Sequence, residues 1–240
     1  MASSETRVVD DGAQLVLPLH VRDPQSLDYF VPHSGVAEAL GLLQQSLEVV
    51  STDTSAFRMV VLFGPRGVGK SHLLNAFRDA AVQAGLPAAR LVCIDGPELE
   101  EGCAQGGTTW ASRFIDRYER LRSEGGLLLL ASRQAPEELS EDPHLRSRFL
   151  AGAKSMLQLP REEELVPVLK SLFERRNLRV SDYSLEYLIN RLPSDPLSFD
   201  AIVAKIDRFS WEKGLPARQG AIRKVVASGV RLEEKPDDAI

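Results

Sequence analysis

The sequence predicts an α/β protein with a parallel β-sheet, followed by a small all-helical domain. In the first two thirds of the chain, short apolar runs of strand length alternate with helical patterns. This alternation is typical of a parallel sheet whose strands are joined by right-handed helical crossovers. After Pro160 only helical patterns follow. We therefore expect a core over 23–160 and a helical domain over 161–228, flanked by a flexible segment, 1–22, and a mobile tail, 229–240.

The expected elements follow from the spacing of apolar residues. Three continuous apolar runs predict buried strands, at 59–63, 91–95 and 127–131. Helical spacing predicts helices at 36–50 and at 108–123. A further helix should begin at the glycine-rich loop after the first strand and end at about 84. A glycine-containing loop is expected at 102–107. In the last third of the chain, helical patterns cover 162–176, 181–191, 198–213 and 217–228.

Composition and charge narrow the class of protein. The formal net charge is −5, which does not favour nucleic-acid binding by the surface as a whole. No apolar run approaches the ~20 residues that cross a bilayer, and the polar segment 1–11 lacks the apolar core of a signal peptide. Cys93 and Cys103 offer no disulfide framework, and the histidines have no metal-ligand spacing. We expect a cytoplasmic protein without a membrane segment.

A glycine-rich loop follows the first strand and matches the pattern G-x-x-x-x-G-K-[S/T]. It runs Gly64-Pro65-Arg66-Gly67-Val68-Gly69-Lys70-Ser71. A strand before the loop and an amphipathic helix after it form the context that a phosphate-binding loop requires. Its backbone N–H groups and the helix N-terminus would hold nucleotide phosphates. Lys70 would neutralise the β- and γ-phosphates, and the Ser71 hydroxyl would bind Mg²⁺. The alternative, a chance glycine-rich turn, is disfavoured because motif and context are both present.

Asp95 ends the second strand and is the candidate for a further contribution to the Mg²⁺ site. An acid at this place holds the Mg²⁺ shell in P-loop proteins. The alternative is an Asp that caps the turn after the strand. The segment between Lys70 and Asp95 has room for one helix and one strand only.

These residues resemble the bacterial replication-initiator DnaA family of AAA+ proteins, in particular its shorter Hda-type members, which regulate DnaA. The resemblance covers about 14–227. Besides the phosphate loop, the matching pieces are the segment 27–31, the strand 91–95, the apolar face Trp110, Phe114, Tyr118 and Leu121, the box 145–149 and the helical tail. The resemblance implies an AAA+ fold with a helical lid.

The resemblance also implies site residues and partners. An adenine nucleotide, ADP or ATP with Mg²⁺, would lie beside Phe30 and Val31. Arg148 would be an arginine finger that acts in trans, with Arg146 as a less favoured substitute. The family's C-terminal helix-turn-helix domain has no counterpart, so direct sequence-specific DNA binding is not expected. The implied partners are the initiator DnaA and the DNA sliding clamp (β subunit), with a homo-oligomer as a further possibility.

A short N-terminal segment resembles the peptide with which Hda-type proteins bind the sliding clamp. It reads Gln14-Leu15-Val16-Leu17-Pro18-Leu19. An extended peptide of this kind fills an apolar groove with its leucines and hydrogen-bonds at the rim through its glutamine. The alternative is an edge strand packed on its own domain.

The sequence departs from the family's pattern in several places. A strand and a helix before Asp95 are missing, so the sheet would lack an edge strand. The alternative is that 91–95 is that earlier strand and the Walker B strand is lost. Gly96 replaces a second acid, and Glu98 is nearby but out of register. The sensor I segment reads Ala131-Ser132-Arg133, and the sensor II arginine falls near Leu197. We therefore expect nucleotide binding, with tight retention of ADP, and weak hydrolysis by this chain alone.

Three functions remain open. A regulator would bind adenine nucleotide, dock on the clamp and present Arg148 to ATP-bound DnaA, promoting hydrolysis in the partner's site. A self-assembling ATPase or helicase loader would hydrolyse ATP itself and lose that activity with Lys70→Ala. A degenerate P-loop module would use nucleotide only to stabilise its fold, and Arg148 would then be a surface ion pair. We favour the regulator, because an arginine finger beside an eroded site suits an activator of another ATPase.

Overall fold

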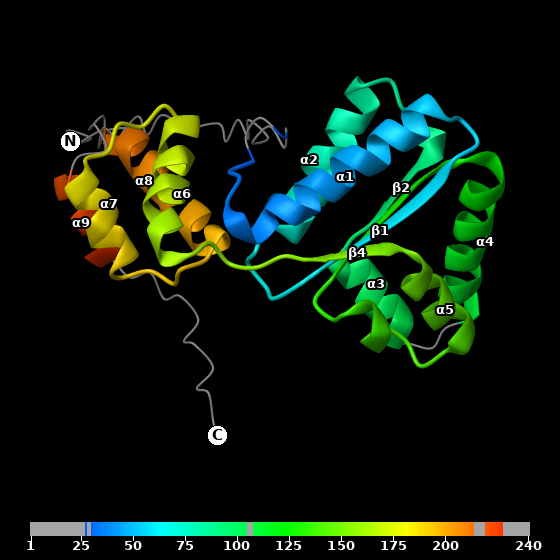
Figure 1. The fold of residues 1–240 in the computed structure, drawn as a ribbon. Helices are drawn as coiled ribbons and strands as arrows, with labels where there is room; N and C mark the ends of the chain where they lie inside the picture. The colour runs from blue at the N-terminus through cyan, green and yellow to red at the C-terminus, as the bar shows by residue number, and fades with distance from the viewer. Residues whose placement is uncertain (1–26, 28–29, 105–107, 214–218, 228–240) are drawn as a thin grey trace, which may run out of the picture.

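The protein, seen in a computed structural model, is a parallel sheet with helices on both faces and a helical bundle beside it (Figure 1). The structure describes residues 27, 30–104, 108–213 and 219–227. The predicted peptide 14–19 lies outside these residues. The predicted α/β class with C-terminal helices is confirmed.

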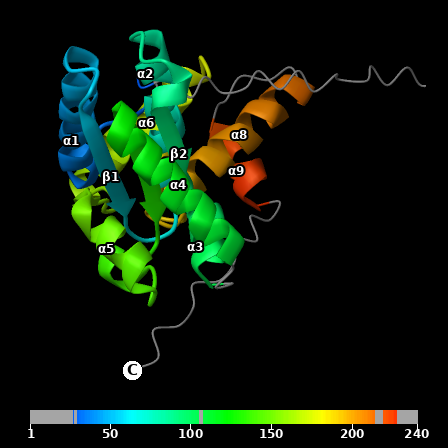
Figure 2. The same cartoon turned by 90° about the vertical axis from the view of Figure 1, so that its right-hand side faces the viewer.

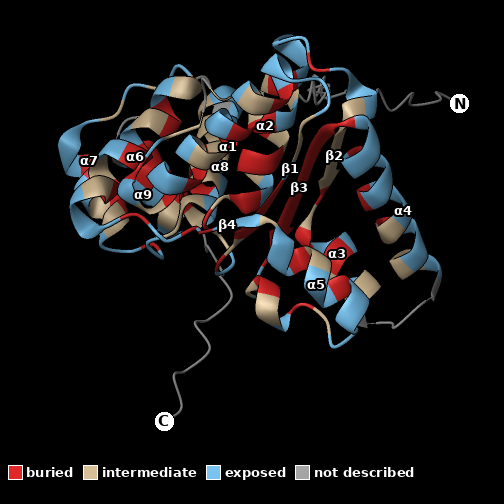
Figure 3. Ribbon diagram, turned by 45° about the vertical axis from the view of Figure 1, so that its right-hand side comes forward, coloured by how far each residue is buried: buried red, intermediate tan, exposed pale blue. Residues whose placement is uncertain are grey.

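Four parallel strands form the sheet in the described part of the chain, in the order β2-β3-β1-β4. They are β1 (Phe57–Phe63), β2 (Leu91–Ile94), β3 (Gly126–Ser132) and β4 (Ala153–Met156). Every residue of β3 is buried, as Figure 3 shows, which is typical of a parallel strand covered on both faces. In the register of β1 and β3, Phe63 lies opposite Ser132. The carboxyl ends of these two strands therefore lie side by side.

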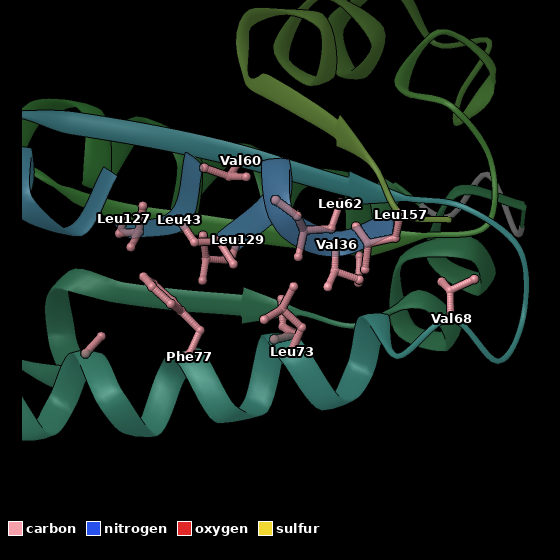
Figure 4. Packing of buried hydrophobic residues seen from close by; sticks show 14 of the residues in the cluster. Val36, Leu43, Val60, Leu62, Val68, Leu73, Phe77, Leu127, Leu129 and Leu157 are labelled. Carbon is pink, nitrogen blue, oxygen red and sulfur yellow. The ribbon is translucent and has the colours of Figure 1, made fainter. Parts of the chain in front are cut away.

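Two helices cover one face of the sheet, α1 (Ser34–Thr52) and α2 (Lys70–Gln83) (Figure 2). The buried residues of α1 recur every three or four positions and so form one apolar face. Leu73 and Phe77 of α2 point towards the sheet, Leu73 on the side of Leu62 and Phe77 on the side of Leu129 (Figure 4). Fully burying a side chain of this size contributes about 1.5–3 kcal/mol. This packing fixes α2, and with it the loop that leads into it, against the sheet.

The other face is covered by α3 (Gly96–Ala104), α4 (Thr108–Glu124) and α5 (Pro143–Ala151). The predicted apolar face of α4 is confirmed, since Phe114, Tyr118 and Leu121 are buried against this face of the sheet. Alternate residues of β1 and β3 supply the two faces, as the period of a strand requires.

A helical bundle follows the sheet and has a hydrophobic cluster of its own. It consists of α6 (Glu162–Arg175), α7 (Asp182–Ile189), α8 (Pro196–Lys213) and α9 (Gln219–Ala227). All buried members of the cluster come from these helices and their connections, while Val31 packs against it from the N-terminal part of the chain. The four helices agree with the predicted ones to within two residues at each end.

Glu164 joins the start of the bundle to the start of α1. Its carboxylate accepts hydrogen bonds from the Arg161 backbone N–H at 2.8 Å, from the Ser34 backbone N–H at 2.7 Å and from the Ser34 hydroxyl at 2.8 Å. These bonds lower the pKa of Glu164 to about 2, with the Arg161 N–H as the largest cause. One charged side chain therefore satisfies N–H groups at two helix starts.

Three elements differ from the prediction, one of them α5, because the sequence analysis names the box 145–149 without predicting a helix there. The sequence predicts a loop at 102–107, but α3 extends through Ala104. Gly102 is needed inside this helix because a Cβ there would meet the Trp110 ring at 2.3 Å. The strand β4 was not predicted, because its sequence is largely polar; three of its four residues are exposed.

The connection before β2 is short, as predicted. Only the 3₁₀ turn η2 (Ala88–Arg90) lies between α2 and β2, and β2 forms an edge of the sheet beside β3. No helix in the described ranges is long and apolar enough to cross a membrane.

Candidate nucleotide-binding site

The loop 64–69 joins the end of β1 to the start of α2 and depends on its glycines. Gly64, Gly67 and Gly69 have φ values of 145°, 87° and 93°, in the region that favours glycine. A Cβ on Gly64 would lie 2.3 Å from the carbonyl oxygen of Leu157, and one on Gly67 would lie 2.8 Å from Oδ1 of Asp195. The loop therefore runs too close to the sheet on one side, and to the bundle on the other, for side chains at these positions.

Lys70 begins α2 and is 9% exposed. Its Nζ donates to the carbonyl oxygens of Gly64 and Pro65, both at 2.7 Å. Burial lowers the pKa of Lys70, while the nearby carboxylates of Glu100 and Asp95 act to raise it. The ammonium group is thus held inside the loop, where a phosphate would be a stronger partner than two neutral carbonyls.

Ser71 and Asp95 come from different elements and meet beside Lys70. The Ser71 hydroxyl donates to Oδ1 of Asp95 at 2.9 Å. The same oxygen accepts the backbone N–H of Gly96 at 2.8 Å, at the start of α3. Asp95 therefore both caps the turn after β2 and faces the phosphate loop. Its contact with Ser71, and the place of β2 beside β3, favour the Walker B assignment over the alternative of an earlier strand.

The Ser71–Asp95 pair suits Mg²⁺. A hydroxyl and a carboxylate are hard oxygen ligands, and Mg²⁺ is commonly held by one or two carboxylates together with substrate phosphates and water. Among the described residues, no group of three or more His, Cys, Asp or Glu could hold a metal. Metal binding here would therefore depend on the nucleotide.

A cleft of about 830 Å³ extends from the phosphate loop to the helical bundle, within the size range of ligand sites. The loop that leaves β1 lies at the side of the sheet that faces the bundle (Figure 1). Residues 66–71, Asp95 and the predicted adenine neighbours Phe30 and Val31 line the cleft. Phe30 makes an edge contact with His72, at 5.6 Å between ring centroids. The structure thus brings the phosphate-loop residues together with Phe30 and Val31 in one cavity.

A charged pair that the sequence analysis missed lies in the same cleft. Oε1 of Glu100, on α3, accepts the backbone N–H of Arg133 at 3.0 Å, and its two carboxylate oxygens accept Arg133 Nε at 3.1 and 2.8 Å. Arg133 Nη2 also contacts this carboxylate. The hydrogen bonds from Arg133 lower the pKa of Glu100. Glu98, the acid that the sequence places nearest to Asp95, pairs with Arg117 instead.

The wall formed by the bundle carries both an aliphatic and a basic residue. Leu197, near which the resemblance places the sensor II position, lines the cleft and is 54% exposed. Arg175, near the end of α6, also lines the cleft, and its position was missed because helical spacing alone does not say which face of α6 meets the sheet. His33 lines the cleft as well, and burial lowers its pKa.

Arg148 lies on α5, away from the residues that line the cleft. Its Nη2 donates to Oε1 of Glu119 at 2.7 Å and its Nη1 to the carbonyl of His144 at 2.8 Å. Its guanidinium carbon lies 5.4 Å from the centre of the Tyr118 ring. This arginine is therefore held against α4, whereas Arg146 on the same helix is exposed.

Sequence comparisons relate the chain to DnaA over most of its length. No protein-family model matches it. A Haemophilus influenzae protein described as uncharacterized is 29% identical over 222 residues, covering 83% of this chain and 92% of that protein. DnaA of Clavibacter sepedonicus is 19% identical over 219 residues, covering 79% of this chain and 46% of DnaA. DnaA 2 of Chlamydia caviae is 27% identical over 187 residues, covering 65% of this chain and 40% of that protein. The chain spans less than half the length of these DnaA proteins.

Solved structures give the fold. Domain III of Thermotoga maritima DnaA superposes with a TM-score of 0.68 at 18% identity, covering 87% of this chain and 98% of that chain. Aquifex aeolicus DnaA bound to AMPPCP gives 0.62 at 18% identity, covering 80% and 67%. The Thermotoga maritima RuvB branch migration motor gives 0.61 at 18% identity, covering 86% and 72%. The chain has the α/β fold of an AAA+ domain, as found in DnaA and RuvB.

Proposed function

We propose that this protein is a nucleotide-binding regulator of DnaA, of the Hda type. The observation that supports nucleotide binding best is the meeting of Lys70, Ser71 and Asp95 at one end of the cleft. Lys70 would neutralise phosphate charge, and the Ser71–Asp95 pair would hold Mg²⁺. AMPPCP, an ATP analogue, is bound to the DnaA of similar fold. We therefore propose ADP or ATP as the ligand, with its adenine beside Phe30 and Val31.

The bundle would act as a lid on the nucleotide. It supplies residues of α6 and of the start of α8 to the cleft. We propose that 23–160 and 161–228 are separate domains and that the nucleotide bridges them. A nucleotide bound between the two domains would stabilise their arrangement by mass action.

Two positions in the cleft, one on each side of it, support weak hydrolysis by the chain itself. Gly96 places no carboxylate directly after Asp95, and Leu197 offers no charge to a terminal phosphate. Stabilising the charge of phosphoryl transfer requires donors fixed where that charge develops. We propose that bound ADP is retained and that the hydrolysis which matters occurs in the site of the partner DnaA.

Arg148 is the proposed arginine finger. Arg148 is 21% exposed and its partner Glu119 is 46% exposed, so the pair lies at the surface, where ion pairs contribute about 0.2–1 kcal/mol. A phosphate of a neighbouring subunit would be a stronger acceptor, so the pair would hold Arg148 ready without preventing its release. Arg146, an exposed arginine two residues earlier on the same helix, is the matched control.

The peptide Gln14–Leu19 would bring the protein to the sliding clamp on DNA. Its glutamine and leucines suit a groove that takes an extended peptide. In this proposal the clamp localises the regulator, and Arg148 acts on DnaA after the two proteins meet. No direct sequence-specific contact with DNA is needed.

The decisive experiment measures hydrolysis of DnaA-bound ATP in the presence of clamp loaded on DNA. We expect the wild type to stimulate hydrolysis, Arg148→Ala to abolish stimulation, and Arg146→Ala to retain it. Removing an arginine finger costs about 10³-fold or more in rate. The Gln14→Ala/Leu17→Ala double variant should lose stimulation in reactions where stimulation by the wild type depends on the clamp. Equal stimulation by wild type and Arg148→Ala would refute the assignment of the finger.

Glu100 supports a second candidate, a protein that hydrolyses ATP itself. This carboxylate lies in the cleft within electrostatic range of Lys70, where a base could orient water. Substantial ATP turnover by the isolated protein, abolished by both Lys70→Ala and Glu100→Gln, would favour the self-assembling ATPase. Nucleotide binding without turnover or stimulation of DnaA would leave the degenerate binding module.

A further inference from the structure

The Glu100–Arg133 pair is built from two elements that meet in the nucleotide cleft. Arg133 directly follows β3, and Glu100 lies one helical turn into α3. The carboxylate accepts from both the backbone N–H and the side chain of Arg133. Glu100 is the better buried partner, with 17% of its side chain exposed against 65% for Arg133. The acid is therefore the more enclosed member of the pair and the guanidinium the more exposed one.

The pair lies near the phosphate end of the cleft. Because Phe63 and Ser132 are partners across the sheet, the phosphate loop and Arg133 leave neighbouring strands at the same edge. Both Glu100 and Arg133 influence the pKa of Lys70, the residue that would contact the β- and γ-phosphates. Glu100 also lies close to the start of α3, with Oε1 3.7 Å from the place where a Cβ on Gly96 would lie.

The charges of the pair cancel close to Lys70, the residue that would contact the β- and γ-phosphates. While Glu100 holds Arg133, the pair offers no net positive charge to a γ-phosphate. Contact between Arg133 and the γ-phosphate would require Arg133 to leave Glu100, and Glu100 would then stand as an unpaired negative charge close by. A diphosphate, one phosphate shorter, does not require this exchange.

We propose that the Glu100–Arg133 pair sets the nucleotide preference of the cleft by favouring ADP over ATP, an inference that rests on the proposed nucleotide binding. Glu100 competes with the γ-phosphate for Arg133. The two residues therefore have opposite effects on ATP affinity, although they form one ion pair.

The experiment measures dissociation constants for Mg²⁺-ADP and Mg²⁺-ATP by competition with a fluorescent nucleotide. Glu100→Gln should raise ATP affinity about fivefold and leave ADP affinity within about twofold, since it frees Arg133 for phosphate. Arg133→Gln should lower ATP affinity about fivefold, since it leaves Glu100 unpaired beside the phosphate site. The ADP-to-ATP preference thus shifts in opposite directions in the two variants.

The pair Glu98–Arg117 provides a matched control. It also joins α3 to another element, at 3.4 Å, but neither residue lines the cleft. Glu98→Gln and Arg117→Gln should leave the preference unchanged. Thermal unfolding without nucleotide checks that each variant is folded.

The outcomes separate this inference from the proposed function. If binding depends on Lys70 but neither variant changes the preference, or both change it in the same direction, the pair has only a structural role and the inference is wrong. If the wild type binds neither nucleotide, the proposed function fails and this inference fails with it.

Discussion

Two sets of residues in the cleft differ in how they use charge. On the phosphate-loop wall, Lys70 and the Ser71–Asp95 pair come together through partners that a nucleotide can replace. In the second set, Glu100 and Arg133 lie beside this wall and satisfy each other, and Leu197 on the bundle carries no charge. The phosphate-loop wall is suited to hold phosphates, whereas the second set keeps the guanidinium of Arg133 on a carboxylate.

This difference separates binding from hydrolysis. Binding a diphosphate needs backbone N–H groups, one lysine and a metal site, all of which come from the loop and the strand next to it. Hydrolysis needs in addition fixed donors at the terminal phosphate. A chain with the phosphate-loop wall but without such donors can keep a nucleotide as a structural ligand and leave the reaction to a partner's site.

The largest effect is expected from Lys70→Ala. The substitution removes the cation of the phosphate-loop wall, so affinity for both ADP and ATP should fall by about 100-fold, corresponding to about 2.7 kcal/mol. Isothermal titration with each nucleotide measures it. The control is Lys154→Ala, because Lys154 forms an exposed ion pair with Glu137 outside the cleft. Unchanged affinity in Lys70→Ala would show that the phosphate-loop wall is not the binding wall.

The sequence predicts those features of the cleft that are formed by residues adjacent in the chain. The phosphate loop is a contiguous motif after an apolar strand, and Asp95 ends the next apolar run, so both can be identified from the sequence alone. Their contact also needs the sheet to place β2 near the start of α2. The strand order is not visible in the residues, but a parallel sheet already puts both ends at one edge.

The parts that the sequence did not predict depend on tertiary contacts. Gly96, Pro97 and Gly102 argue against a helix, yet Pro97 falls in the first turn, where proline is tolerated, and Gly102 makes room for Trp110. Without α3, Glu100 could not be placed on the cleft side. The spacing of Gly96, Pro97, Glu100 and Glu101, all of which line the cleft, is the helical signal that could have found it.

A medium effect is expected from Leu197→Arg, which adds a positive charge to the bundle side of the cleft. Leu197 is exposed and lines the cleft, so a longer side chain can be accommodated and can reach towards a phosphate. ATP affinity should rise about fivefold, with a smaller change for ADP. Leu150→Arg, at an exposed position of α5 outside the cleft, is the control. If the affinities for ATP and ADP rise equally, the added charge acts at long range and makes no specific contact with the terminal phosphate.

The smallest effect concerns the joint between the sheet and the bundle, where Glu164 links the start of α6 to the start of α1. The folded-state pKa of Glu164, about 2, lies below its ordinary value of 4.5. The charged carboxylate therefore stabilises the fold at pH values above about 4.5, and this contribution is lost as the pH falls towards 2. Glu164→Gln keeps the shape but weakens the bonds to Ser34 and Arg161, and should lower the Tm near neutral pH by a few °C, on the order seen for single helix-capping contacts.

The pH dependence distinguishes a charge effect from a general packing defect at this joint. The Tm difference between wild type and Glu164→Gln should be largest near neutral pH and should shrink as Glu164 becomes protonated in the wild type. Glu163→Gln, one residue earlier and paired only loosely with Arg161 at 4.0 Å, is the matched control and should change little at any pH. A Tm difference that stays constant down to about pH 2 would mean that the side chain's shape, and not its charge, holds the bundle to the sheet.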